Sequence, residues 1–130
     1  MIVVAAGLAL WGSGAAAQDY PNKPIRVIVP EVVGSAADLM SRIIGQRLAE
    51  ALGQSVSYEN LFLEAGVEKA IKAAPDGYTL MYGSSGNVAL LPHVKKVSFD
   101  PLKDLTPVGR FVIQPTLIAT NAALDRKSVV

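Results

Sequence analysis

The feature that most constrains the fold is the stretch from Pro75 to His93, PDGYTLMYGSSGNVALLPH. It combines a turn at Asp76-Gly77, an apolar run typical of a buried strand, and a Gly/Ser loop that leads into a helix start near Asn87. A loop of this kind at the carboxyl end of a strand is where α/β folds bind ligands. The stretch therefore predicts both a fold class and the position of a site.

Strand and helix patterns alternate along the rest of the chain. Short apolar or alternating runs predict strands, and apolar residues spaced by three and four predict helices. In the long helix these apolar residues are expected to form the buried face. The predicted strands are 24–30, 55–60, 78–82 as the central strand and 108–120 broken at Pro115, and the predicted helices are 37–52, 67–74 and 87–94 interrupted by Pro92. The alternation predicts an α/β fold in which helices cover both faces of a mixed, mostly parallel sheet.

Composition excludes several function classes. A chain of 130 residues with 51% hydrophobic residues is large enough for one domain with a core. The net charge of +1 and the absence of a dense Lys/Arg cluster argue against nucleic-acid binding. With no cysteine, and with His93 as the only histidine, the sequence offers no metal site of the usual ligand count. We therefore expect no metal and no cofactor.

The N-terminus has the features of a secretory signal. Residues 1–17 carry no charge, and the apolar run IVVAAGLALW precedes Ala15-Ala16-Ala17, which satisfies the small-x-small rule for cleavage. The run is too short for a stable membrane anchor and is followed by the polar QDYPNKP. The basic residue that normally opens such a signal is missing, and a cytoplasmic protein with an apolar N-terminus is the alternative. We predict a signal peptide at 1–17 and a mature chain at 18–130.

Four segments resemble one protein family: PIRVIVP at 24–30, ENL at 59–61, the GSSG stretch within 75–93, and FDPLKDLTPV at 99–108. Through these four segments the chain resembles the Bug-type receptors of tripartite tricarboxylate transporters, which are extracytoplasmic and capture small carboxylates. The resemblance implies a lobe like those of type II periplasmic binding proteins, a periplasmic location, no enzymatic activity, and membrane transporter subunits as partners. It also implies that residues 18–130 are the incomplete N-terminal part of a solute-binding lobe, with the second lobe absent.

The resemblance places ligand contacts in two loops: Gly34, Ser35 and Asp38 in the first, and Ser84, Ser85, Gly86 and Asn87 in the second. In the family, a glycine-rich first loop holds carboxylates through main-chain amides. Here Glu31 stands where the family has an aromatic residue, and Ser35 and Ala36 replace glycines. The run from Ser35 to Asp38 also fits a capping box, which would explain both residues without a ligand. Ligand contact and helix capping both remain open for this loop.

A third loop and two rival functions complete the expectations. Where the family has a glycine-rich segment, this chain has Leu61, Phe62 and Leu63, which are expected to need burial. A capped turn is expected around Pro101 in FDPLKDL. One rival is a truncated, non-functional remnant of such a receptor. The other is a small serine hydrolase built from Ser85, His93 and Asp100, although the G-x-S-x-G elbow is absent. The receptor hypothesis requires Gly34 and Ser85 to lie at the same edge of the sheet.

Overall fold

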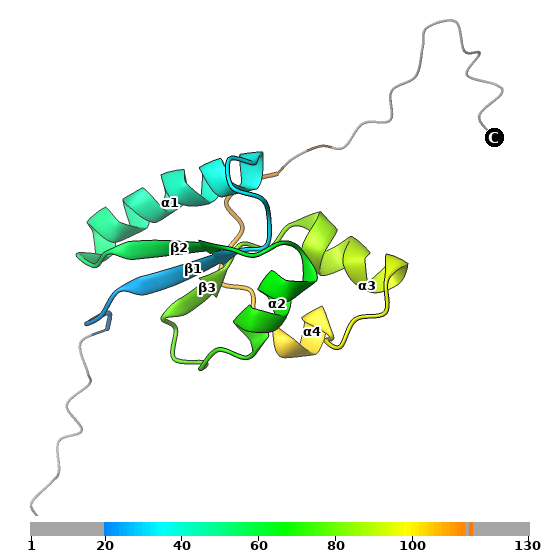
Figure 1. Ribbon diagram of the computed structural model, residues 1–130. Coiled ribbons are helices and arrows are strands. Elements are labelled where there is room, and N and C mark those ends of the chain that lie inside the picture. The colour runs from blue at the N-terminus through cyan, green and yellow to red at the C-terminus, as the bar shows by residue number, and fades with distance from the viewer. Residues whose placement is uncertain (1–19, 114, 116–130) are drawn as a thin grey trace, which may run out of the picture.

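The computed structural model describes residues 20–113 and 115 (Figure 1). The predicted signal peptide at 1–17 therefore lies outside the described residues. The elements follow one another as β1 (Ile25–Val29), α1 (Ala36–Leu52), β2 (Val56–Asn60), α2 (Glu64–Ile71), β3 (Thr79–Met81), the π-helical segment η1 (Ser85–Leu90), α3 (Leu91–Val94) and α4 (Pro101–Asp104). No helix in this part of the chain has the length and apolarity to cross a bilayer.

The three described strands form a parallel sheet in the order β2-β1-β3. In the register, Ile25 lies opposite Val56, and Arg26 lies opposite Thr79. The prediction that the strand at 78–82 is central is wrong for the described sheet, because β1 pairs with both neighbours. The reason lies in β1 itself, whose apolar side chains are buried on both faces, so this strand takes the middle position.

The strand order also decides where the helices lie. The chain crosses from β1 to β2 in one direction and from β2 to β3 in the other. Because parallel crossovers are right-handed, these two connections must place their helices on opposite faces. Accordingly, α1 packs on β1 and β2, while α2 packs on β1 and β3, and Figure 1 shows the two helices on either side of the sheet. The predicted α/β architecture with helices on both faces is confirmed.

The boundaries of α1 follow from its caps. Ser35 is the N-cap, and its hydroxyl accepts a hydrogen bond from the N–H of Asp38. Gly53 is the C-cap in the left-handed conformation, with a φ of 65°, which glycine adopts without a steric penalty. The predicted helix at 37–52 is therefore confirmed with one further residue at its start.

The predicted buried face of α1 is wrong. Leu39 and Ile43 are 54% and 58% exposed, whereas the buried residues of the helix are Asp38, Ser41 and Gly45. The physical reason is close packing against β2. A Cβ at Gly45 would lie 1.9 Å from the hydroxyl oxygen of Tyr58, so a small residue is needed where the helix meets that ring. Small and polar residues therefore form the contact face.

The C-terminal part of the described chain differs from the predictions. Residues 108–113 form no strand, so the predicted strand is wrong there, and 116–120 lie outside the described residues. Helical structure begins at Ser85 rather than Asn87 and continues past Pro92, which lies in the first turn of α3 where its missing N–H costs little. The capped turn at Pro101 is confirmed as α4, with the Asp100 side chain accepting from the N–H of Leu102.

Candidate functional site

Two of the predicted loops meet at one edge of the sheet. The loops after β1 and β3 leave the carboxyl ends of neighbouring parallel strands. In a sheet of order 2-1-3 this position is the topological switch point, where the chain departs to opposite faces and a crevice forms. The contact is direct, because the hydroxyl oxygen of Ser84 lies 3.5 Å from Oε1 of Glu31. Gly34 and Ser85, in these loops, therefore lie at the same edge.

Asp38 is the centre of the hydrogen bonds behind the first loop. The residue is 1% exposed, and its side chain accepts hydrogen bonds from the N–H of Gly34 at 2.9 Å and from Nε of Arg42 at 3.1 Å. The bond from Arg42, with those from Gly34 and Asn60, lowers the pKa of Asp38 from 3.8 to about 2, although burial opposes the shift. Asp38 is therefore ionised at physiological pH, and its charge is offset by the guanidinium of Arg42.

Asn60, the last residue of β2, ties the first loop to the sheet. Its Nδ2 donates to Oδ1 of Asp38 at 3.0 Å and to the carbonyl oxygen of Glu31 at 3.3 Å. Sequence reasoning included Asn60 only as part of the matching segment at 59–61 and assigned no role to Arg42. The spacing of four between Asp38 and Arg42 is the signal that could have found this ion pair.

The predicted amide donors of the first loop are used within the protein. The N–H of Gly34 donates to Asp38, and the N–H of Ser35 donates to the carbonyl oxygen of Val32 at 3.2 Å. Gly34 has a φ of 81°, a conformation that favours glycine. Ligand contact and helix capping were both possible for this loop. In the structure the hydroxyl of Ser35 caps α1, and the carboxylate of Asp38 holds the loop at Gly34.

The second loop is held by a capping box between Ser84 and Asn87. The N–H of Ser84 donates to Oδ1 of Asn87 at 2.8 Å, and the N–H of Asn87 donates back to the hydroxyl oxygen of Ser84 at 3.3 Å. Asn87 is completely buried, and its Nδ2 has no partner among the described residues. Ser85 is exposed, and its hydroxyl makes no hydrogen bond within the same part of the chain. The two residues thus occupy different places: Asn87 lies behind the loop and Ser85 on its surface.

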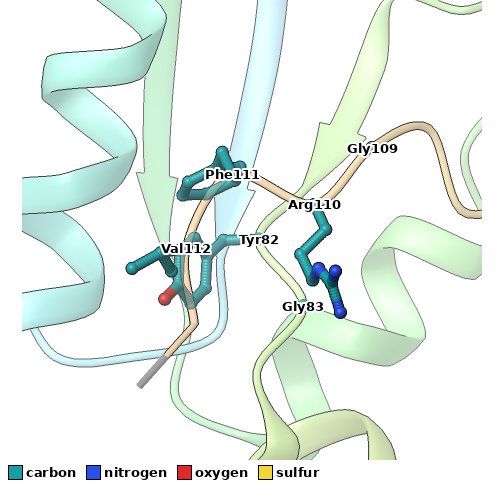
Figure 2. A pocket seen from close by; sticks show the side chains of 6 residues that line it. All are labelled: Tyr82, Gly83, Gly109, Arg110, Phe111 and Val112. Carbon is teal, nitrogen blue, oxygen red and sulfur yellow. The ribbon is translucent and has the colours of Figure 1, made fainter.

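A shallow pocket of about 190 Å³ adjoins the second loop (Figure 2). It is lined by Tyr82, Gly83 and residues 109–112, and the rings of Tyr82 and Phe111 meet edge to face at 5.6 Å between centroids. Arg110 contributes an exposed guanidinium to this pocket and forms no ion pair with any described residue. Sequence reasoning missed Arg110, because only the tertiary fold brings it beside Gly83.

The third loop is short and closely bonded to the end of β1. The N–H of Leu61 donates to the carbonyl oxygen of Val29, and the N–H of Leu63 donates to the carbonyl oxygen of Pro30. Leu63 has a φ of 44°, which is unusual for a residue other than glycine. Phe62 is 62% exposed, so the expected burial is wrong for this residue. The loop lacks side chains that could donate to a ligand.

The residues of the hydrolase hypothesis do not form a catalytic constellation in the described structure. His93 is exposed on α3, and Asp100 is engaged with Leu102 and Lys103 of α4. Within the described residues, no hydrogen bond joins Ser85, His93 and Asp100. The same part of the chain holds no group of three or more His, Asp or Glu side chains placed to bind a metal ion.

Most of this chain is similar in sequence to a known protein family and to several curated proteins. Residues 40–130 match the tripartite tricarboxylate transporter family receptor. A UPF0065 protein of Bordetella bronchiseptica is 37% identical over an alignment of 119 residues that covers 88% of this chain and 36% of that protein. Protein BugT of Bordetella pertussis is 32% identical over 137 residues, covering 99% of this chain and 40% of BugT. The chain thus spans well under half the length of these relatives.

Solved structures show the same fold. A periplasmic transporter is 38% identical with a TM-score of 0.61, over 65% of this chain and 30% of that one. MatC from Rhodopseudomonas palustris, solved with bound malate, is 31% identical with a TM-score of 0.56, over 68% of this chain and 32% of MatC. Sequence and fold agree, and the chain belongs to the tripartite tricarboxylate transporter receptor family.

Proposed function

We propose that the chain contributes to an extracytoplasmic receptor that captures a small carboxylate and presents it to the membrane subunits of a tripartite tricarboxylate transporter. The observation that carries the proposal is the meeting of the β1 and β3 loops at a topological switch point, in a member of this receptor family. Receptors of this family act in the periplasm, so the proposal includes export through the signal predicted at 1–17.

We assign different roles to the candidate residues. The ligand contacts are Ser84, Ser85 and Gly86, because this loop presents an exposed hydroxyl beside the pocket. Arg110 adds a guanidinium that can pair with a carboxylate through charge-assisted hydrogen bonds. The remaining candidates hold the two loops in place through their hydrogen bonds, and these are Gly34, Ser35, Asp38 and Asn87.

Nuclear magnetic resonance titration of the isotopically labelled full chain with malate tests the proposal. Malate is chosen because it occupies the similar protein MatC. This measurement detects millimolar affinities, which suits a chain that spans 30% to 32% of its structural relatives. We expect saturable shifts in the amide signals of Gly83 to Asn87, and at least a threefold weaker affinity in Ser85→Ala and in Arg110→Gln.

The matched control is Ser55→Ala. Ser55 is also exposed and precedes β2, at the opposite, amino end of the strands, so its loss should leave malate binding unchanged. Shifts spread evenly over the surface, or equal losses in Ser55→Ala and Ser85→Ala, would refute a site at the loops. Turnover of an activated ester that is lost in Ser85→Ala would support the hydrolase instead. A folded chain that neither binds nor reacts would support the remnant.

A further inference from the structure

Glu31 is an acid with no ion-pair partner in the described part of the chain, at the edge where the two loops meet. It follows the buried Pro30 at the end of β1, is partly buried, and approaches Ser84 across 53 residues of sequence. Glu31 takes part in none of the ion pairs of the described residues, in contrast to Asp38 nearby, which is paired with Arg42. A carboxylate with no cationic partner among the described residues therefore lies beside the loop that carries the proposed ligand contacts.

Arg110 supplies a charge of opposite sign beside Gly83, the residue that precedes Ser84 in the second loop. It lines the pocket with Gly83, whereas Glu31 contacts Ser84. The two charged side chains do not pair with each other. The segment from Gly83 to Ser84 is thus flanked by one acid and one base, each without a charged partner among the described residues.

Resting on the proposed function, we propose that Glu31 and Arg110 select a zwitterionic ligand, an amino carboxylate, over a dicarboxylate of the same size. Arg110 pairs with the carboxylate of the ligand, and Glu31 accepts a hydrogen bond from its ammonium group. A second ligand carboxylate in place of the ammonium would be repelled by Glu31, because two like charges at such a short distance oppose each other.

A purely structural role for Glu31 is the competing explanation. Its Oε1 accepts from the hydroxyl of Ser84, and this contact by itself could hold the two loops together. Replacement by glutamine separates the two roles. Glu31→Gln keeps a side-chain oxygen that accepts from Ser84 and removes only the charge. A bridging role predicts no change in ligand preference, whereas a selective role predicts a large one.

The experiment compares 4-aminobutyrate with succinate, which both have four carbons and differ at one end, where an ammonium group stands in place of a carboxylate. Both are titrated into the labelled full chain and into Glu31→Gln at the same ionic strength. We expect the full chain to bind 4-aminobutyrate about tenfold more tightly than succinate, and Glu31→Gln to lose this preference. Glu31→Asp should retain it. Glu50→Gln is the control, because Glu50 lies on the exposed far end of α1 and should not affect the ratio.

The outcomes separate this inference from the proposed function. Equal or tighter binding of succinate by the unaltered chain overturns the role of Glu31, whatever the variants do. An unchanged ratio in Glu31→Gln, with a dispersed amide spectrum that shows a folded protein, overturns it as well. If neither compound nor malate binds to the folded chain, the proposed function itself is wrong and this inference falls with it.

Discussion

Nδ2 of Asn60 donates to Oδ1 of Asp38 at 3.0 Å, which joins the last residue of β2 to the first turn of α1. The same amide group donates to the carbonyl oxygen of Glu31 at 3.3 Å. One side chain thus links a strand, a helix and the loop that follows β1. The position of this loop, which carries Glu31, therefore depends on Asn60.

Replacement of Asn60 by alanine should lower the free energy of unfolding by about 1 to 3 kcal/mol, because it removes both of these hydrogen bonds, which are partly buried. Urea denaturation measures the change. Gln46→Ala is the control on the exposed surface of α1, with an expected change within about 0.5 kcal/mol. Equal losses in the two variants would contradict the linking role.

Asp38 should make the free energy of unfolding depend on pH in the acidic range. Its pKa is about 2 in the folded protein, below the ordinary value of 3.8, so the unfolded state takes up protons first as the pH falls. Its contribution to stability is therefore complete above about pH 4 and is lost as the pH falls through 2. Urea midpoints measured from pH 5 to pH 2 should fall less steeply in Asp38→Asn. Parallel curves for the two proteins would show that this carboxyl is not responsible.

Gly66 permits close contact between α2 and the end of β1. A Cβ at this buried position would lie 2.7 Å from the carbonyl oxygen of Leu61 and 2.9 Å from Cβ of Pro30. Gly66→Ala should therefore lower the free energy of unfolding by about 1 to 3 kcal/mol, although alanine is the better helix former. Gly109→Ala, where a Cβ meets nothing within 4 Å, is the control and should change it little. A stabilised Gly66→Ala would refute the contact.

The exposed apolar face of α1 should tolerate charge. Ile43 is 58% exposed, so Ile43→Lys should change the free energy of unfolding by no more than about 0.5 kcal/mol. Ser41 is 5% exposed on the opposite face, and Ser41→Lys should cost at least about 3 kcal/mol because it buries an unpaired charge. Thermal and urea denaturation of both variants tests the orientation. If Ile43→Lys is the more damaging, the apolar face is buried after all.

Local sequence signals were sufficient for several elements. The run of apolar residues in β1, the caps of α1 at Ser35 and Gly53, and the turn at Pro101 all lie where the sequence predicts them. Each depends on interactions within a few residues, which the chain carries in its own order. The convergence of the β1 and β3 loops also follows from the pattern, once the strands are parallel and neighbouring.

Other features required the tertiary structure. Periodicity in α1 predicted a buried face of leucine and isoleucine, but the helix rests on Gly45 because the ring of Tyr58 occupies that position. The central position of β1 depends on which strands pair, and that is a long-range choice. No spacing in the sequence connects Glu31 with Ser84, or Arg110 with Gly83.

By itself, the sequence determined the type of fold, the ends of its main helix and the two loops in which a ligand is expected. The tertiary structure alone decided which face of α1 is buried, how Asp38 is neutralised, and which charges stand beside those loops. The physical reason is the sequence separation of the interacting residues. Caps and turns are made by neighbours in the chain, whereas the charge around a site is set by side chains that only packing brings together.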